Sequence, residues 1–591
     1  MEPVETVYAI TDHTRCLAFM LGDGIIPSNV KAGYLARLVI RRTLRMLRDL
    51  HISAKLSDLV LLHIDNMPEY PEFRERIDTI TEILALEEER FADTLDRGRR
   101  LVQKTAAHFR ERNETIPEVE LIQLYDTHGI PPEIAKEAAA EAGVRVELSD
   151  TFYSLVAKKH NRAEAAEREE PGYRLPGIKP TLGMYYDAPA QAEFRAKVVA
   201  VVNGGVVLDR TLFYPEGGGQ PADHGTLYAG NESSKVLDVQ ILDGIIVHEV
   251  DSQIFRKGDE VTGKIDWERR SAHMRHHTAT HIINESAKKV LGKHIWQTGA
   301  QKSVDRARLD ITHFKRITGE ELNRIEMLAN REVMADIPVE ITWKERVEAE
   351  KRYGFVLYQG GVPPGREIRI LKVGDDVEAC GGTHVPSTGR IGAIKVLRTE
   401  RIQDGVERIE FAAGDAAVKW MQERDRLLDS SADVLRVSSE HLPETVERFF
   451  NEWKDLKKEN ERLKEELAGM RVKVMLGDAE EIGGVRVVRR LVPDADMEEL
   501  LKIASEFSKN DEVVALLASA DGAGGAKIVV SAGAKATLRG INAGAIAKAM
   551  SGTVGGGGGG KLSIAQGGGP RGDKIDEALI RGIELIREKL G

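Results

Sequence analysis

Residues 276–281 read His-His-Thr-Ala-Thr-His, and residues 380–384 read Cys-Gly-Gly-Thr-His. Each stretch places two metal-ligand side chains four positions apart, and on a helix such positions lie on one face. Three imidazoles and one thiolate are a donor set that suits tetrahedral Zn²⁺. We therefore predict that two distant segments fold together around one zinc ion, held by His277, His281, Cys380 and His384.

The alternative is that these residues bind no metal. A single His-x-x-x-His pair on a helix is common in proteins without a bound ion. Here a second pair accompanies it, and that pair contains one of only two cysteines in the chain, Cys16 and Cys380. The Gly-Gly step inside the second pair lets the backbone bend tightly. Together these features favour the metal site.

The composition is typical of a soluble protein with several domains. The chain has 591 residues, of which 42% are hydrophobic and 30% charged, and this length exceeds a single core. Two cysteines exclude a disulfide framework and suit a reducing cytoplasm, which is the expected location. No apolar run of about 18 residues marks a membrane span. The net charge of -11 argues against coating nucleic acid, although a local basic face is compatible with it.

Residues 1–165 are expected to form a helical domain. A helix from about 31 to 50 carries arginines along one face, Arg37, Arg41, Arg45 and Arg48. Such a stripe either pairs with nucleic-acid phosphates or is a solvated face, and both interpretations remain open. Residues 125–131 predict a helix-breaking turn that exposes Asp126. The highly charged stretch 157–171 is expected to be a linker.

Residues 172–265 change to the alternating pattern of short strands, which predicts a small β-barrel. The stretch Phe213–Pro221 interrupts the strands with three consecutive glycines, whose backbone can approach a ligand closely. Residues 266–413 then combine the helix of His277 and His281 with strands around Cys380, so we expect an α+β zinc-binding core there.

Residues 414–477 show the three-and-four spacing of a coiled coil, with Trp453, Asn460 and Leu467 at one seam position. We expect this segment to form a homodimer, and the alternative is a hairpin against a helix at about 415–435. Residues 478–591 predict an α/β module. Its glycine run, 555–560, is either a flexible linker or a phosphate-binding loop before a helix, and it lacks the spacing of a Walker A nucleotide site.

These motifs resemble the editing domain of alanyl-tRNA synthetases and of free-standing trans-editing relatives. The resemblance rests on Phe213–Pro221, His277-x-x-x-His281, Gln297 and Cys380–His384. The segments Asp23–Asn29 and Tyr125–Gly129 are similar to that family's tRNA-acceptor recognition domain. There, the residues matching Asn29 and Asp126 read the G·U pair of tRNA(Ala). The C-terminal module is similar to the family's tRNA-binding C-terminal domain.

The resemblance implies a multidomain α+β fold. We expect an N-terminal α-helical domain (1–165), a β-barrel (172–265) with an α+β zinc editing core (266–413), coiled-coil helices for dimerisation (414–477), and a Gly-rich C-terminal α/β domain (478–591). In the family, an ATP-dependent class II aminoacylation core precedes the matching segment, and no equivalent is recognisable here. The expectation is therefore a C-terminal portion that does not itself activate alanine.

The implied reaction is hydrolysis of tRNA(Ala) wrongly esterified with serine or glycine. Thr280, Gln297 and Cys380 are the candidates for catalytic roles, and Ala300 is a further pocket residue. Four protein ligands would close a tetrahedral zinc ion, so a second hypothesis is a non-catalytic tRNA-binding and dimerisation module with structural zinc. A third, a hydrolase of small phosphoesters, ranks last because the chain lacks the Asp-His-His metal cluster of that family.

Overall fold

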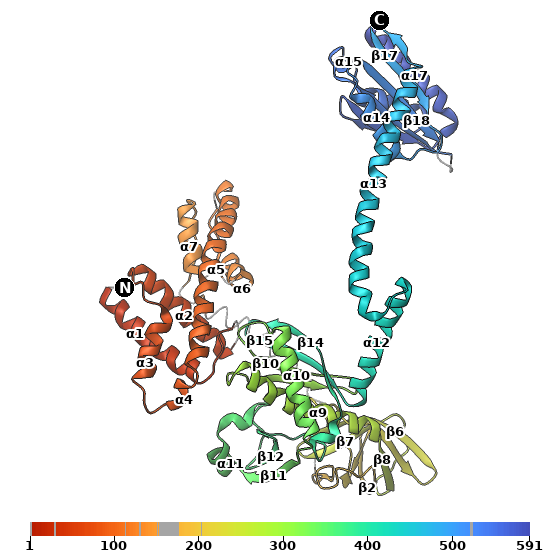
Figure 1. Ribbon diagram of the computed structural model, residues 1–591. Coiled ribbons are helices and arrows are strands. Elements are labelled where there is room, and N and C mark those ends of the chain that lie inside the picture. Colours follow the sequence, from red (N-terminus) through yellow and green to blue (C-terminus); the bar gives the residue numbers. More distant parts are fainter. Residues whose placement is uncertain are drawn as a thin grey trace. The chain divides into compact units, whose positions relative to one another are not determined.

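The computed structural model divides into two units, Met1–Asp425 and Arg426–Gly591 (Figure 1). It describes residues 3–28, 31–112, 114–128, 130, 132–149, 152, 177–202, 204–520 and 524–591. Asn29, the side chain of Asp126 and the predicted linker at 157–171 lie outside this description.

The N-terminal stretch is helical. Its helices are α1 (Pro3–Gly22), α2 (Lys31–Asp49), α3 (Leu56–Asp65), α4 (Pro71–Arg74), α5 (Ile77–Glu111), α6 (Glu118–His128) and α7 (Pro132–Glu141). α1, α2, α3 and α5 bury one apolar cluster that includes Leu17, Ile40 and Leu84. Helix α6 continues through His128, so the backbone of Asp126 is helical and residues 125–128 do not form the predicted turn.

Six strands close into the predicted β-barrel, in the order β2-β3-β7-β6-β5-β8. They are β2 (Glu193–Val202), β3 (Gly205–Leu208), β5 (Gly225–Ala229), β6 (Glu232–Leu242), β7 (Ile245–Val250) and β8 (Glu260–Ile265). Buried and exposed residues alternate at the start of β2, as a strand with one face in a core requires. A short parallel pair, β1 (Leu182–Gly183) and β4 (Arg210–Thr211), lies outside the barrel.

Residues 266–413 combine helices with two antiparallel sheets, ordered β14-β15-β10-β9 and β11-β12-β13. The helical elements are α9 (Trp267–Leu291), α10 (Gly319–Met334), α11 (Arg346–Tyr353), η1 (Phe355–Tyr358) and η2 (Thr388–Ile391). The strands are β9 (Gln297–Lys302), β10 (Ala307–Thr312), β11 (Val339–Glu345), β12 (Glu367–Val373), β13 (Asp376–Ala379), β14 (Ile394–Gln403) and β15 (Val406–Ala413).

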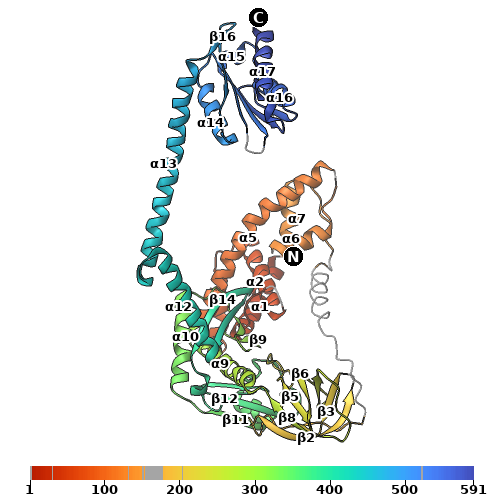
Figure 2. The same ribbon diagram turned by 90° about the vertical axis from the view of Figure 1, so that its right-hand side faces the viewer.

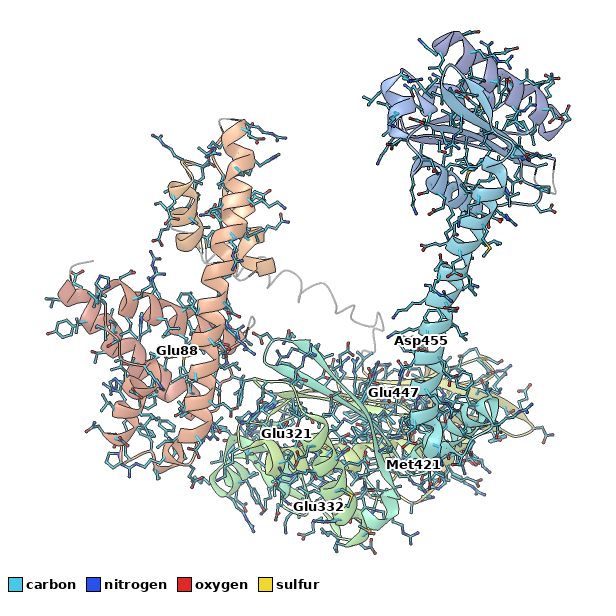
Figure 3. All side chains as sticks on the ribbon, turned by 45° about the horizontal axis from the view of Figure 1, so that its top comes forward. Glu88, Glu321, Glu332, Met421, Glu447 and Asp455 are labelled. Carbon is cyan, nitrogen blue, oxygen red and sulfur yellow. The ribbon has the colours of Figure 1, made fainter. Side chains whose placement is uncertain are left out.

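Local sequence signals fix the ends of the two long helices in this region. Asp266 caps α9 by accepting a hydrogen bond from the Arg269 backbone N–H. Thr318 and Glu321 form a reciprocal capping box at the start of α10, and Glu321 is labelled in Figure 3. Both helices pack against the first sheet through an apolar cluster that includes Ile283 and Ile325. Helix α9 is therefore held firmly, and it carries two of the predicted ligands.

The second unit is a six-stranded sheet covered by helices on both faces (Figure 2). The strand order is β16-β17-β18-β19-β21-β20, with β16 (Glu480–Ile482), β17 (Val485–Leu491), β18 (Val513–Ala520), β19 (Ala526–Ala532), β20 (Gly557–Gly560) and β21 (Ile564–Gly569). The helices are α13 (Leu442–Leu476), α14 (Met497–Ser508), α15 (Ala534–Leu538), α16 (Ala543–Thr553) and α17 (Ile575–Leu590), with short turns η3 (Ser439–His441) and η4 (Gly572–Lys574).

The glycine run forms an edge strand, which differs from both sequence-based interpretations. β20 pairs antiparallel with β21, so this stretch is neither a flexible linker nor a loop that opens a helix. Helix α16 packs directly on the two strands. A Cβ added at Gly558 or Gly567 would overlap the Ser551 side chain, whereas a Cβ at Gly557 would meet nothing. Glycine is therefore required by the close approach of the helix.

The predicted seam on α13 is exposed. Trp453 and Leu467 keep 55% and 47% of their surface, while Ala468 and Val472, on another side of the helix, pack against α14 and the sheet. Glu447 and Asp455 mark the same helix in Figure 3. Helix α12 (Asp415–Leu435) crosses the boundary between the units. The exposure of Trp453 and Leu467 shows that no hairpin with α12 covers these two side chains.

Candidate metal centre

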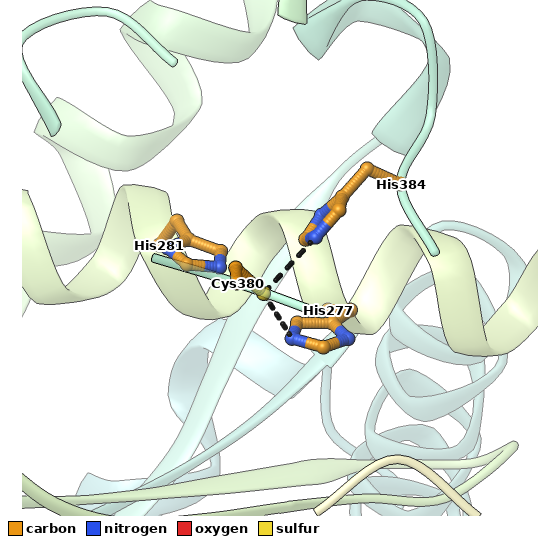
Figure 4. Close-up of side chains that lie close together, drawn as sticks. All are labelled: His277, His281, Cys380 and His384. Carbon is orange, nitrogen blue, oxygen red and sulfur yellow. Dashed lines mark hydrogen bonds between the residues drawn. The ribbon is translucent and has the colours of Figure 1, made fainter. Parts of the chain in front are cut away.

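The four predicted ligands lie together at one point between α9 and the loop after β13 (Figure 4). The Cys380 Sγ lies 3.4 Å from His277 Nε2 and 3.3 Å from His384 Nε2. One donor atom from each of the four residues falls within 4.8 Å of all the others. The three imidazoles are buried, and the thiol is half-buried. Two segments about a hundred residues apart thus supply one cluster.

Hydrogen bonds hold each imidazole with Nε2 directed at the cluster. His277 donates from Nδ1 to the Gln220 side-chain oxygen at 2.8 Å. His281 donates from Nδ1 to Asp376 at 3.0 Å. His384 donates from Nδ1 to the Thr278 hydroxyl oxygen at 3.2 Å, because the Thr278 proton is already directed to Met274 O. Such partners are what orient the histidine ligands of metal ions.

The charges of the cluster suit a cation. Burial and the Lys302 charge lower the pKa of His277 well below its usual range, and burial and His281 do the same for the pKa of His384. Burial raises the pKa of the Cys380 thiol, but the adjacent His281 outweighs burial and lowers it. Neutral imidazoles and a thiolate are the forms that bind metal. The donor set therefore fits Zn²⁺.

His281 differs from the other two imidazoles, because its raised pKa favours the protonated form, which must lose a proton before a metal binds. Burial lowers its pKa, but the carboxylate of Glu378 and the hydrogen bond to Asp376 outweigh burial and raise the pKa well above its usual value. Asp376 and Glu378 are themselves buried, and together with His281 they form a second group of potential ligands. A carboxylate behind a ligating histidine increases its basicity as a ligand.

Glycine is required at the loop that carries the thiolate. A Cβ at Gly382 would overlap the His277 ring. The loop's carbonyl groups are held from both sides: Arg369 donates to the Cys380 oxygen at 2.7 Å, and Tyr214 donates to the Gly381 oxygen at 3.2 Å. The loop is thereby fixed between β12 and the barrel.

A cavity of about 770 Å³ opens beside the cluster. Its walls include the Gly217–Gly219 loop of the barrel, Thr280 on α9, and Gln297 and Ala300 on β9. The Thr280 hydroxyl donates to the His276 carbonyl at 2.8 Å, so its oxygen remains able to accept a hydrogen bond. The residues predicted for the pocket, Thr280, Gln297 and Ala300, therefore line one cavity.

Lys302 is a pocket residue that the sequence did not reveal. Its ammonium is buried and donates to the Gly218 carbonyl at 3.0 Å, which ties β9 to the glycine loop. Burial lowers the pKa of Lys302 to about 8.

Gln220 lies within the Phe213–Pro221 stretch, and it contacts both halves of the cluster, a role that the sequence did not reveal. Its side-chain nitrogen donates to the Thr383 hydroxyl at 2.8 Å, and its oxygen accepts from the Thr383 backbone N–H and from His277. Asp376 and Glu378 were also missed. The available signal was their spacing, since residues two apart on a strand that leads to Cys380 point to one side.

The predicted tRNA-binding arginines lie on α2 in different surroundings. Arg37 is buried, and its guanidinium binds Glu87 at 2.7 Å and also Asp404. Arg41 is half-buried, while Arg45 pairs with Asp49 at 3.7 Å near the surface. Arg37 therefore connects α2 and α5 to the loop between β14 and β15.

Comparisons with known families match three parts of the chain. The model for class II (A) tRNA synthetases matches residues 2–269, and the DHHA1 domain matches residues 484–588. The threonyl and alanyl tRNA synthetase second additional domain matches residues 368–410, which contain the Cys380–His384 loop. Two of these three models describe tRNA synthetases, so this chain is similar to alanyl-tRNA synthetases. The donor cluster lies partly in the part of the chain that matches the second additional domain.

Close relatives are named alanine–tRNA ligases. The chain is 60% identical to that of Methanosarcina acetivorans, 59% to that of Methanosarcina mazei and 47% to that of Thermococcus kodakarensis. These alignments cover 100%, 99% and 100% of this chain, and the chain spans 64% of the length of each relative. A crystal structure of the C-Ala domain from Aquifex aeolicus alanyl-tRNA synthetase is 26% identical over 19% of this chain and 96% of that one, with a TM-score of 0.17, which carries no structural argument.

Two further predictions, the missing aminoacylation core and the absence of a membrane span, can be compared with these findings. The absence of an aminoacylation core is not confirmed, because the class II synthetase model matches residues 2–269. None of the described helices combines the length and the apolar character needed to cross a membrane.

Proposed function

We propose that this chain binds tRNA(Ala) and hydrolyses the ester of tRNA(Ala) mischarged with serine or glycine. One observation carries the proposal. Three imidazoles and a thiolate converge beside a cavity whose wall includes Thr280 and Gln297. The family's second additional domain covers the thiolate loop, which supports the same assignment.

A bound zinc ion would supply Lewis-acid polarisation of the ester or a water of lowered pKa. The chain's own residues provide selection. The Thr280 oxygen lies in the cavity and is able to accept a hydrogen bond from the hydroxyl of serine. A site that hydrogen-bonds a substrate hydroxyl strongly disfavours an analogue without it. Correctly charged alanyl-tRNA is thereby spared.

The alternative is a non-catalytic module in which zinc is structural. The closed set of four protein donors favours this alternative. The third hypothesis, a hydrolase of small phosphoesters, gains no support, since among the residues described in 484–588 the structure has no group of three potential metal ligands.

The deciding experiment measures deacylation of Ser-tRNA(Ala) by the full chain, alongside its zinc content. We expect Cys380→Ala to lose zinc and deacylation together, while Cys16→Ser, at the exposed other cysteine, retains both. Full loss of zinc with unchanged deacylation would remove the metal from the reaction. A folded, zinc-loaded protein without deacylation would favour the structural module.

The tRNA-binding surface is proposed on the N-terminal helices. Arg41 and Arg45 are both half-buried on α2, and Arg45 pairs with Asp49 near the surface, so these two are proposed to face phosphates, with Asn29 and Asp126 as base-reading candidates. Arg37, whose guanidinium is held by Glu87 and Asp404, is proposed to position this surface rather than to contact tRNA.

Two further proposals concern the assembly and the first step of ligation. The exposed seam of Trp453, Asn460 and Leu467 supports a homodimer through α13. The ligase names of the relatives raise alanine activation with ATP as an activity of the family. Alanine-dependent ATP–pyrophosphate exchange tests whether this chain has that activity: measurable exchange would place the chemistry in residues 2–269, and no exchange would leave only the proposed hydrolysis.

A further inference from the structure

A second cavity, of about 1410 Å³, adjoins the pocket of the candidate metal centre. One of its walls is the loop Asp23–Ser28, and others come from the end of α9 and from η1. Four residues line both cavities: Trp296, Gln297, Thr298 and Gln359. The two cavities therefore adjoin along these four residues, which we call the neck.

The neck is held firmly. The Trp296 backbone N–H donates to the Thr312 hydroxyl at 2.8 Å, and the Trp296 carbonyl accepts from the Thr312 N–H at 2.9 Å. The Gln297 N–H donates to the Gln359 side-chain oxygen at 2.9 Å, which joins β9 to the segment after η1. The indole of Trp296 nevertheless remains 38% exposed. An exposed aromatic ring on a backbone held in this way can stack against a nucleic-acid base.

The second cavity is lined by more cationic than acidic side chains, although Lys288 and Lys289 are themselves paired with Asp376 and Asp375. Its cationic residues are Arg76, Lys288, Lys289 and Lys293, against the acidic Asp23, Glu285 and Asp310. Asp310 is neutralised by Arg408, with which it forms a bidentate pair at 2.6 and 2.8 Å. Lys293 pairs with Glu75 on the surface, where both side chains are mostly exposed. Such exposed pairs are weak, so a phosphate can replace the carboxylate.

We propose that the two cavities form one path, along which the single-stranded 3′ end of a tRNA passes from the Asp23–Ser28 loop to the candidate metal centre, with one base stacked on Trp296 at the neck. The inference rests on the proposed function. It adds to that function a positioning residue and a route. The loop at the entrance is the segment similar to the family's acceptor-recognition domain, and the far end is the pocket with Thr280.

Kinetics on two substrates test the role of Trp296. For Ser-tRNA(Ala), we expect Trp296→Ala to lower kcat/KM about tenfold or more, mainly through KM, because a base–aromatic stack of this kind is lost. Trp296→Phe keeps a ring and should retain most of the activity. For a seryl ester of adenosine, which lacks the preceding nucleotides, Trp296→Ala should match the unsubstituted chain, which also verifies its folding.

The matched control is Trp267→Ala. Trp267 is 37% exposed, close to the value for Trp296, and it lines neither cavity. We expect this variant to keep full activity on both substrates. Equal behaviour of the Trp296→Ala and Trp267→Ala variants on Ser-tRNA(Ala) would overturn the proposed path.

A binding measurement separates the path from the hydrolysis. A protein whose only tryptophan is Trp296 is made by the substitutions Trp267→Phe, Trp343→Phe, Trp420→Phe and Trp453→Phe. Uncharged tRNA(Ala) at saturation should quench its fluorescence, whereas tRNA(Ala) without its 3′-terminal single strand should not. Equal quenching by both RNAs, or by neither, contradicts the path even where deacylation is intact. Selective quenching without deacylation supports the path and refutes the proposed hydrolysis.

Discussion

Gln220 connects the barrel to both halves of the donor cluster through three hydrogen bonds, while being completely buried. Its amide is the partner that fixes the His277 ring. Since groups behind a ligand set its orientation, the position of a bound metal would depend on a residue that does not belong to the donor cluster.

Replacement of this amide should weaken metal binding. In the Gln220→Ala variant, His277 Nδ1 and the Thr383 N–H lose their acceptor, and we expect zinc affinity to fall about 10- to 100-fold. Competition with a chromophoric chelator measures this affinity. Gln301→Ala, at an exposed position on β9, is the control and should bind zinc normally. An unchanged affinity in the Gln220→Ala variant would show that His277 needs no such support.

The ligand residues themselves were predictable because each pair follows a local rule, four positions apart. Their supporting partners were not, because Gln220, Thr278 and Asp376 meet the histidines only after the barrel, α9 and β13 have packed together. Residue type and spacing along the chain hold no information about such contacts.

The glycine-rich edge of the second unit shows how an element depends on its neighbour. Strands β20 and β21 carry glycines because α16 approaches their backbone closely. A run of glycines in sequence looks the same whether it is a loop, a linker or a strand under a helix. The sequence therefore could not decide the structure of this stretch, although it predicted the α/β character of the module around it.

A methyl group at this contact should destabilise the unit. The Gly567→Ala side chain would overlap Ser551, and we expect a loss of about 1–3 kcal/mol, as for other overpacked positions. Faster amide hydrogen exchange along β21 measures the loss. Gly557→Ala on the adjacent strand, where a Cβ meets nothing, should leave exchange unchanged. Equal exchange in both variants would argue against close packing of α16.

The apolar seam of helix α13 is exposed, and no described element packs over Trp453 or Leu467. If the seam pairs with that of a second chain, the double variant Trp453→Asp and Leu467→Asp should be monomeric, because it places charges at two desolvated positions. Analytical ultracentrifugation gives the mass. Lys458→Ala, on the opposite side of the helix in the heptad pattern, should behave as the unsubstituted chain does. A monomeric unsubstituted chain would refute the dimer.

The two units differ in how they should respond to acid. Every imidazole with a lowered pKa belongs to residues 1–425, at positions 13, 63, 224, 248, 273, 276, 277, 294, 313 and 384. His281 is the exception there, since its pKa is raised. The second unit contains only His441. Acidity should therefore weaken the first unit more than the second.

His248 in the barrel provides the clearest measurement. Burial lowers its pKa to about 4, below the value of about 6.5 expected in an unfolded chain. Between these values the unfolded chain binds a proton that the folded barrel does not, so stability is lost as the pH falls from 6.5 towards 4. Amide exchange in β7, corrected for its intrinsic pH dependence, should accelerate between pH 7 and pH 5. A His248→Gln variant should show a smaller change, and β18 in the second unit should serve as the internal control.

At the level of the molecule, the family resemblance and the barrel followed from the sequence because alternation and spaced motifs are local signals. The route between the two cavities did not, since the Asp23–Ser28 loop and Trp296 lie far apart in the chain. The ion pairs of Arg37 with Glu87 and Asp404 could not be predicted for the same reason. Of the predicted arginine stripe on α2, Arg37 is buried in these pairs, whereas Arg45 lies nearer the surface.

The separation of His277 from His384 also has a consequence during synthesis on the ribosome. At the usual speed of translation, about 5–20 s pass between the emergence of the first histidine and the last. During most of that interval the nascent chain offers only two of the four predicted ligands, His277 and His281, which are too few to retain an ion against cellular competitors. We therefore expect a metal to bind late, when the Gly217–Gly219 loop of the barrel packs against the folded core of residues 266–413.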